Sequence, residues 1–289
     1  MADTPQVNSD SSVETTGHEW DGIVEANNPL PRWWVWVFLA TVIWAVGYWV
    51  VMPAWPLAFG YTEGLLGYSQ RATVADRIAA AQAARANVAA RLLNVPLEQA
   101  FAEPDLLEFG IAGGRSVFLV NCSQCHGTGA AGSPGYPNLN DDDWIWGGSL
   151  EAIYQTIMYG VRSGHDEARF NQMPAFLADG ILEAGDIDDV AEYVLSLSGT
   201  TDAAAAAERG KQVFADWCVS CHGEEGEANP ELGAPNLRDS IWLYGGDKAT
   251  IVDTISKSRS GVMPAWEGRL SPVSIRELAI YVHSLGGGE

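Results

Sequence analysis

Two short cysteine motifs carry the chemistry of this 289-residue chain. Each motif has two cysteines separated by two residues and followed at once by a histidine. The residues are Cys122, Cys125 and His126 in the first motif, and Cys218, Cys221 and His222 in the second. A C-x-x-C pair can bind zinc, exchange disulfides or attach haem, and a following histidine favours c-type haem attachment. In such a site the thiols bond to the haem and the histidine binds the iron. The sequence therefore predicts two covalently bound haem c groups.

The other uses of a C-x-x-C pair fit this chain less well. Zinc sites built from two such pairs have them about 15–20 residues apart, whereas Cys122 and Cys218 are 96 positions apart. A thioredoxin-like motif belongs to a βαβ unit, but the flanking sequence has the apolar spacing of helices. All four cysteines belong to the two motifs, which leaves none for a disulfide framework.

Two methionines are candidates for the sixth position on the iron. Met173 and Met263 each lie in a Met-Pro-Ala-aromatic loop downstream of a cysteine motif. A thioether opposite histidine raises the reduction potential of haem. Methionine also commonly fills cores, but recurrence of the same loop in both places favours ligation. Met158 aligns with Ser256, which argues against a ligand role for Met158. The sequence leaves open whether each methionine binds the nearer haem or crosses to the other.

Two further histidines and two prolines are expected to have structural or orienting roles rather than to bind iron. His165 lies in a segment without a counterpart downstream, and His283 aligns with Leu195, so we expect a loop histidine and a helix-face histidine. Bis-histidine ligation is the less favoured alternative. Pro137 and Pro235 follow the two motifs at similar distances. Their carbonyls are predicted to accept the ring N–H of the motif histidines and so to orient them.

The segments around the two motifs are copies of each other, which predicts tandem domains at residues 106–199 and 200–289. The matching pairs are Gly114–Phe118 with Gly210–Phe214, Pro137–Leu139 with Pro235–Leu237, Trp144–Gly148 with Trp242–Gly246, Met173–Phe176 with Met263–Trp266, and Tyr193–Val194 with Tyr281–Val282. In the last segment of each copy, apolar residues recur with the spacing of a helix, and no segment of the copies alternates apolar and polar residues as a strand does. The sequence predicts two all-α domains.

An uncharged stretch of 20 residues, Trp33–Met52, precedes the copies. At about 1.5 Å per residue a helix of this length crosses the ~30 Å hydrocarbon core of a bilayer. Tryptophans lie near both of its ends, as expected at headgroup level. A cleaved signal peptide is the rival interpretation, but residues 1–32 hold six acids and Arg32 as the one base. We therefore predict an uncleaved transmembrane anchor at 33–55 after an N-terminal tail.

Residues 56–105 are predicted to form a helical linker. Ser69 is a candidate N-cap for an alanine-rich helix that continues to Leu93. Its arginines would lie on a solvated face. The linker is expected to hold the haem domains away from the membrane.

Charge restricts the partners of the chain. With 16 basic and 37 acidic residues, the formal net charge is −21, so nucleic acid would be repelled. Residues 106–199 hold 13 acids and 3 bases, and residues 200–289 hold 13 acids and 8 bases. Acidic runs are usually only solvated surface. The run Asp141–Asp143 also fits a hypothesis in which a negative face steers a basic donor cytochrome.

Two features together resemble a known family. The two Gly-x-x-x-Phe, C-x-x-C-H, Pro-Asn-Leu and Met-Pro-Ala modules are similar to class I cytochrome c domains. The run from His18 to Trp34, with its Asp-Gly-Ile and Asn-Pro-Leu-Pro-Arg-Trp-Trp segments, is more specific. Nearly the whole chain resembles the dihaem subunit III of cbb3-type cytochrome c oxidases.

The resemblance implies a location, partners and ligands. It implies a bacterial inner membrane, a cytoplasmic N-terminus and periplasmic haem domains. Electrons would pass from a soluble or membrane-bound cytochrome c, or from a bc-type complex, toward the monohaem and catalytic subunits. The subunit itself would not reduce oxygen. Haem would be attached at Cys122, Cys125, Cys218 and Cys221, with His126, His222, Met173 and Met263 as axial ligands.

Two functions from other classes remain as alternatives. The cytochrome subunit of a periplasmic dehydrogenase would carry similar haem modules. A dihaem peroxidase needs an iron with a vacant or displaceable sixth site, which the paired methionines Met173 and Met263 count against.

Overall fold

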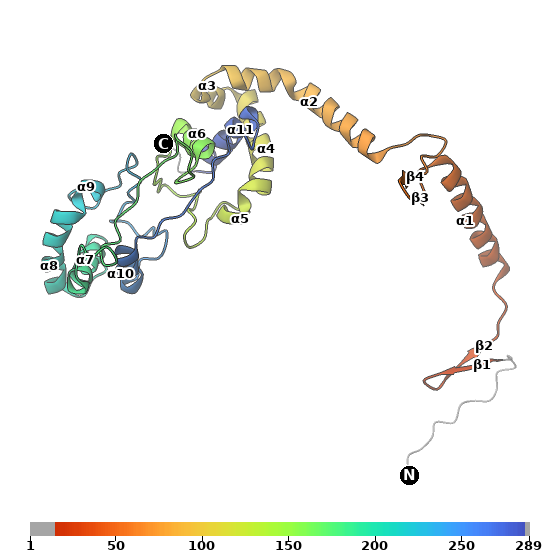
Figure 1. Cartoon of the computed structure of the whole chain (residues 1–289), viewed down its shortest axis with the longest axis horizontal. Coiled ribbons are helices and arrows are strands. Elements are labelled where there is room, and N and C mark those ends of the chain that lie inside the picture. Colours follow the sequence, from red (N-terminus) through yellow and green to blue (C-terminus); the bar gives the residue numbers. More distant parts are fainter. Residues whose placement is uncertain (1–14, 287–289) are drawn as a thin grey trace, which may run out of the picture. The chain divides into compact units, whose positions relative to one another are not determined.

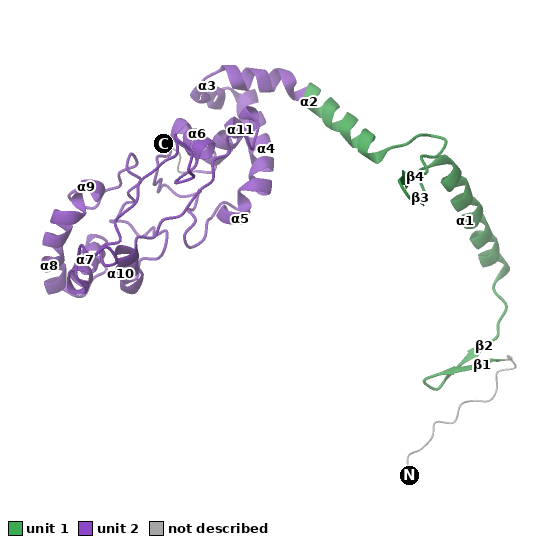
Figure 2. Cartoon of the chain, in the orientation of Figure 1, with its two compact units in different colours: residues 1–83 green, residues 84–289 purple. Residues whose placement is uncertain are grey.

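The computed structural model describes residues 15–286, and the first part of the predicted tail, residues 1–14, lies outside them. The chain forms two compact units, residues 1–83 and 84–289 (Figure 2). Helices dominate both units, as Figure 1 shows. The prediction of an all-α protein is confirmed, and the described residues include one N-terminal helix that could span a membrane.

The first unit begins with a two-stranded antiparallel hairpin of β1 (Thr15–Trp20) and β2 (Ile23–Ala26). Asp21 and Gly22 form its turn, with φ of 49° and 85°. Two successive positive φ values are typical of the tight turn that suits the twist of a hairpin, and Asp-Gly is a preferred pair there. All ten strand residues are exposed.

Helix α1 (Arg32–Val51) is the predicted anchor, shifted by one residue from the uncharged stretch. It is long and apolar enough to cross a membrane, and none of its residues is buried within the protein. Helix α1 ends where Met52 becomes extended, just before Pro53. A short ribbon of β3 (Pro56–Leu57) and β4 (Gly60–Tyr61) follows. The chain then returns, and the amides of Leu65 and Leu66 donate to the Val50 and Val51 carbonyls, both at 3.0 Å. These bonds satisfy carbonyls that a helix end leaves unpaired.

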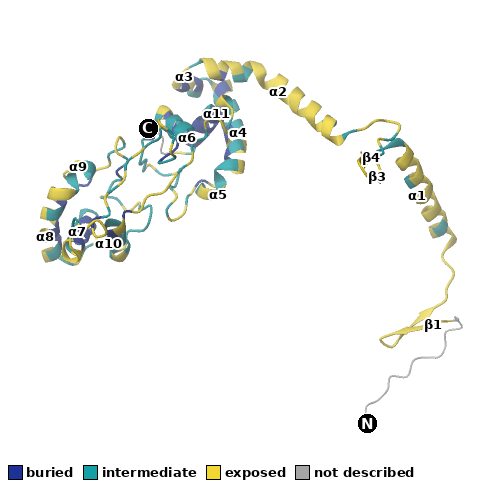
Figure 3. Ribbon diagram, in the orientation of Figure 1, coloured by how far each residue is buried: buried dark blue, intermediate teal, exposed yellow. Residues whose placement is uncertain are grey.

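Helix α2 (Gln70–Asn94) is the predicted linker helix. The Ala72 amide donates to Ser69 Oγ at 3.2 Å, so the predicted N-cap is confirmed. Most of α1 and α2 is exposed, whereas buried side chains gather in the second unit (Figure 3). Near the end of α2, Arg85 pairs at 2.5 Å with Glu277, whose side chain is 3% exposed.

The second unit is built from nine further helices in the part of the chain that the structure describes. They are α3 (Leu97–Ala102), α4 (Pro104–Asn121), α5 (Ser123–His126), α6 (Leu150–Tyr159), α7 (Ala184–Leu197), α8 (Ala204–Trp217), α9 (Val219–His222), α10 (Lys248–Lys257) and α11 (Pro272–His283). The closing helices predicted from apolar spacing are α7 and α11.

The two sequence copies exchange their closing helices. Helix α4, which leads into the first cysteine motif, packs against α11 at the end of the second copy. Helix α8, which leads into the second motif, packs against α7 at the end of the first copy. Phe118 of α4 and Leu278 of α11 are fully buried in one core cluster, and Phe214 of α8 lies with Val190 of α7 in another. The limits 106–199 and 200–289 remain a prediction about the sequence copies.

A glycine permits each of these helix crossings. A Cβ added at Gly114 would lie 2.1 Å from the carbonyl oxygen of Glu277, and one added at Gly210 would lie 2.0 Å from that of Asp189. Both distances are far shorter than a van der Waals contact, and both obstacles are backbone atoms. Only glycine lets the paired helices approach so closely.

Replacing Gly114 by alanine should therefore destabilise the second unit by about 1–3 kcal/mol, the usual cost of overpacking. The measurement is the midpoint of thermal unfolding. Gly185→Ala is the matched control, because a Cβ there meets no atom within 4 Å and alanine favours the helix. Equal midpoints for the two variants would contradict the helix pairing.

Candidate haem-binding sites

Each cysteine motif forms a single helical turn at the end of a longer helix. In the first motif, the amides of Cys125 and His126 donate to the Cys122 carbonyl at 3.1 and 3.0 Å. Residues three and four apart share one face of a helix. The two thiols and the imidazole are therefore presented on the same side of the turn. This is the arrangement needed to hold a haem edge and to place a ligand beneath its iron.

The second motif repeats this geometry. The amides of Cys221 and His222 donate to the Cys218 carbonyl at 3.1 and 2.9 Å. Helices α8 and α9 thus meet at Cys218 as α4 and α5 meet at Cys122. The repeated sequence therefore adopts the same local structure at both motifs.

A proline carbonyl orients each motif histidine. His126 Nδ1 lies 3.0 Å from the Pro137 carbonyl oxygen, and His222 Nδ1 lies 3.2 Å from that of Pro235. Both predicted contacts are confirmed. A carbonyl oxygen can only accept, so Nδ1 carries the proton and Nε2 keeps its lone pair. Burial lowers the pKa of both histidines, which favours the neutral ring that binds a metal.

The first thiol of each motif is not prepared for thiolate chemistry. Burial, with a smaller effect from Cys125, raises the pKa of Cys122 to about 11. Burial, with a smaller effect from Cys221, raises the pKa of Cys218 to about 12. Disulfide exchange uses a cysteine whose pKa is lowered. The raised pKa of Cys122 and of Cys218 therefore argues against a redox disulfide at either motif.

The loop of Met263 lies against the first cysteine motif, although it belongs to the second sequence copy. Met263 packs on the core cluster that contains Phe118 and Ile157, and Cys122 borders the same cluster. The backbones of Met263 and Val161 exchange two hydrogen bonds, both 3.0 Å long. The loop is therefore fixed to the turn that follows α6.

The loop of Met173 is held by the second copy in the same way. Ser258 Oγ, just after α10, donates to the Met173 carbonyl. The amides of Phe176 and Ala178 donate to the carbonyls of Ile255 and Ser256 at 3.1 and 3.2 Å. The methionine loops thus exchange between copies together with the closing helices.

The remaining histidines have other partners. His165 Nε2 lies 3.0 Å from a carboxylate oxygen of Glu267, and its ring stacks on Tyr159 with centroids 4.8 Å apart. The ring of His283 meets that of Phe101 edge to face at 4.7 Å. His18 lies in exposed strand β1. These placements agree with the loop and helix-face interpretations.

Two residues that the sequence analysis did not single out contact the methionine loops. Arg162 and Ser258 are both in the left-handed region, with φ of 50° and 57°. This conformation is uncommon for residues other than glycine, and no sequence pattern indicates it.

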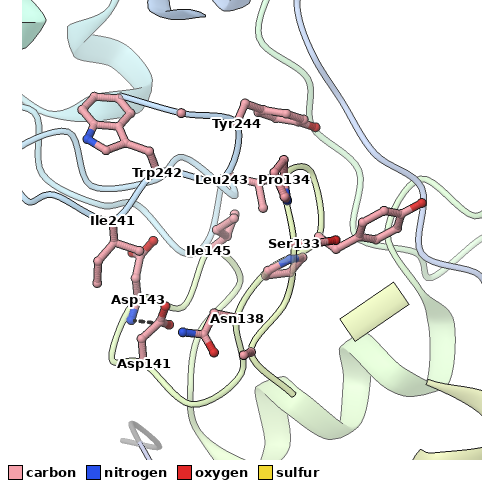
Figure 4. Close-up of a pocket in the computed structure, with 14 residues that line it drawn as sticks. Ser133, Pro134, Asn138, Asp141, Asp143, Ile145, Ile241, Trp242, Leu243 and Tyr244 are labelled. Atoms are coloured by element: carbon pink, nitrogen blue, oxygen red, sulfur yellow. Dashed lines mark hydrogen bonds between the residues drawn. The ribbon is translucent and has the colours of Figure 1, made fainter. Parts of the chain in front are cut away.

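The loops that follow the two motifs meet at a cavity of about 270 Å³ (Figure 4). Asp141 and Asp143 line it from the first copy, and Trp242 and Tyr244 from the second. Burial, and then the nearby charges of Asp239 and Asp141, raise the pKa of Asp143 to about 6. The acidic run is therefore not uniformly solvated, because only Asp142 of its three residues is exposed.

Replacing Asp143 by asparagine should stabilise the protein at pH 8 and leave it unchanged at pH 4. A folded pKa above the unfolded value means that the native state binds more protons between about pH 4 and 6, so the ionised carboxylate destabilises it above that window. We expect a gain of about 1 kcal/mol, after allowance for solvent screening of a half-exposed group. Thermal unfolding at both pH values measures it. Asp142→Asn removes the same charge from an exposed site, and an equal gain there would contradict the assignment to burial.

Comparison with known proteins places the chain in a family. Residues 12–58 match the N-terminal domain of cytochrome oxidase-cbb3, FixP, and residues 110–194 and 205–282 match the family of cytochrome c oxidase, cbb3-type, subunit III. The chain belongs to this family. The cbb3-type cytochrome c oxidase subunit FixP of Bradyrhizobium sp. (strain ORS 278) is 55% identical over the whole of both chains. Subunit CcoP of Cereibacter sphaeroides is 50% identical over the whole of both chains.

Membership of the subunit III family fixes the coarse function. The chain is a membrane-anchored electron-transfer subunit of a cbb3-type oxidase, it has cytochrome c domains for haem c, and it is not the catalytic subunit. The dehydrogenase and peroxidase alternatives are not supported. With its one candidate N-terminal span among the described residues, the subunit belongs to the inner membrane.

Proposed function

We propose that this subunit passes electrons, through two covalently bound haem c groups, from a donor cytochrome c to the monohaem and catalytic subunits of the oxidase. The observation that carries the proposal is the duplicated arrangement of an oriented motif histidine and a methionine loop. The Met263 loop lies in the same half of the second unit as His126, and the Met173 loop lies in the same half as His222.

The packing supports a crossed set of ligands. One haem would be bound by Cys122, Cys125, His126 and Met263. The other would be bound by Cys218, Cys221, His222 and Met173. The support is that each methionine loop is hydrogen-bonded to the helix or turn that follows the opposite cysteine motif.

The chain's own residues then act by holding geometry and tuning potential. Haem iron supplies the one-electron redox chemistry. The two thiols of each motif would attach the haem, and the Pro137 and Pro235 carbonyls hold the histidines in the tautomer that can bind a metal through Nε2. A histidine and a methionine together on each iron would leave no site for oxygen and would raise the potential.

The proposed topology puts residues 1–32 in the cytoplasm and the second unit in the periplasm. It follows from α1 as the anchor and from the expectation that haem c is attached outside the cytoplasm. Protease added to intact spheroplasts should remove the haem-bearing part and spare a fragment that contains residues 1–32. Lysed spheroplasts are the control, in which the tail should also be digested. Digestion of the tail alone in intact spheroplasts would reverse the topology.

A direct test of the function uses the detergent-solubilised chain and a basic cytochrome c as donor. The chain has a net charge of −21, so oppositely charged partners should associate quickly. We expect the reduced donor to reduce two haems per chain, at a rate that falls as salt is raised above about 0.1 M because of screening. Co-purification with the other oxidase subunits should accompany this activity. A chain that accepts no electrons from the donor and purifies alone would contradict the proposal.

A further inference from the structure

The guanidinium of Arg162 connects the two methionine loops. Its Nε donates to the carbonyl of Gly261 at 2.7 Å, and its Nη1 donates to the carbonyl of Asn171, also at 2.7 Å. Gly261 lies two residues before Met263, and Asn171 lies two residues before Met173. One side chain therefore contacts both loops at equivalent positions.

The backbone of Arg162 is held in a costly conformation. Its φ is 50°, and a left-handed residue with a side chain costs roughly 1–2 kcal/mol. Its amide donates to the Arg169 carbonyl at 2.8 Å, and the preceding residue, Val161, forms the double hydrogen bond with Met263. Strained residues persist where the surroundings determine them, and they gather at functional sites.

The charge of Arg162 is retained although the side chain is partly buried. Burial lowers its pKa, but the guanidinium stays protonated in proteins. Its planar fork has several donors in fixed directions, so it can bind two carbonyls at once, which a lysine ammonium does less well. The Asn171 side chain fixes the junction further, because its Nδ2 donates to the Leu232 carbonyl at 2.7 Å.

The arginine in the corresponding turn of the second sequence copy makes different contacts. Arg259 is the second residue after α10, whereas Arg162 is the third residue after α6. The guanidinium of Arg259 pairs with Asp253 and lies 5.5 Å from the Tyr244 ring centroid. There, the neighbouring Ser258 contacts the Met173 loop. The connection between both loops is thus a property of the first copy's arginine.

We propose that Arg162 is a positioning residue that holds the two methionine loops together, so that one guanidinium sets the sixth ligands of both haems. This rests on the proposed ligation by Met173 and Met263. Loosening Arg162 releases both methionines, and the two haems respond together.

Competition by imidazole for the ferric iron tests this in the detergent-solubilised chain. The far-red absorption band of thioether-ligated ferric haem reports methionine loss, and the two reduction potentials report each haem separately. Arg162→Gln should raise the affinity for imidazole roughly tenfold or more at both haems, because a hydrogen bond to a charged donor is lost at each loop. Arg162→Lys keeps the positive charge but not the planar set of donors that binds two carbonyls. In this variant, at most one haem should have the imidazole affinity of the wild-type protein.

Arg209→Gln is the matched control, because it removes the same charge from a forked pair with Asp189 on α7. Imidazole binding in this variant should equal that of the unchanged chain. The inference is overturned if Arg162→Gln affects one haem or neither, or if Arg162→Lys behaves as the unchanged chain at both. If Arg162→Gln does not retain two haems, the imidazole affinities of Arg162→Lys alone decide whether the inference holds. Absence of the far-red band from the unchanged chain would instead show that the ligation proposal has failed.

Discussion

Replacing both Cys122 and Cys125 by alanine is expected to leave one haem on each chain in place of two. The two cysteines share a helical turn with His126, and both thioether links of that haem would be lost together. The haem held by Cys218 and Cys221 should remain, because its motif lies in a separate core cluster. The measurement is the haem that stays with the chain after denaturation, per mole of polypeptide.

The reciprocal variant, Cys218→Ala with Cys221→Ala, is the internal control and should also keep one haem. The single haems of the two variants should differ in reduction potential, since their surroundings differ. Retention of two haems by either variant would show that covalent attachment does not depend on the C-x-x-C-H turns.

Much of the local structure was predictable because local physical chemistry determines it. The uncharged stretch predicted α1 to within one residue, and Ser69 was recognised as the N-cap of α2. The proline carbonyls that orient the motif histidines followed from the matching positions of Pro137 and Pro235. In each case, all the residues that interact lie within one short segment of the sequence.

The exchange of closing helices was not predictable from the same patterns. Apolar spacing shows which face of α7 or α11 is buried, but not which helix covers it. The copies are so similar that both cysteine helices offer a glycine at the crossing, Gly114 or Gly210. The observed pairing brings together residues that are far apart in sequence, such as Arg85 and Glu277, which are 192 positions apart.

The sequence analysis predicted neither the hairpin of β1 and β2 nor the role of Arg162, for different reasons. The hairpin has a recognisable Asp-Gly turn signal, but it lies in a tail where every strand residue is exposed, so burial leaves no alternation to detect. Arg162 depends on a positive φ and on two carbonyls, neither of which its residue type indicates. Backbone carbonyls are available at every residue, so sequence alone cannot select them.

The exchange has a consequence that redox titration can measure. In the background of Cys122→Ala and Cys125→Ala, where one haem remains at the second motif, Met173→His should lower its reduction potential. Histidine in place of methionine removes the ligand that raises the potential. We expect a decrease on the order of 0.2 V, within the ~0.8 V that axial ligands span.

Met263→His in the same background is the matched control and should leave that potential nearly unchanged. Its loop is hydrogen-bonded to Val161 and packs with the first motif, whose haem is missing from this background. Low-spin spectra of all variants would show that the iron stays six-coordinate. If ligation followed the sequence copies, Met263→His would lower the potential of the second haem and Met173→His would not. The two arrangements thus predict opposite results from one pair of substitutions, and the packing of the loops favours the crossed one.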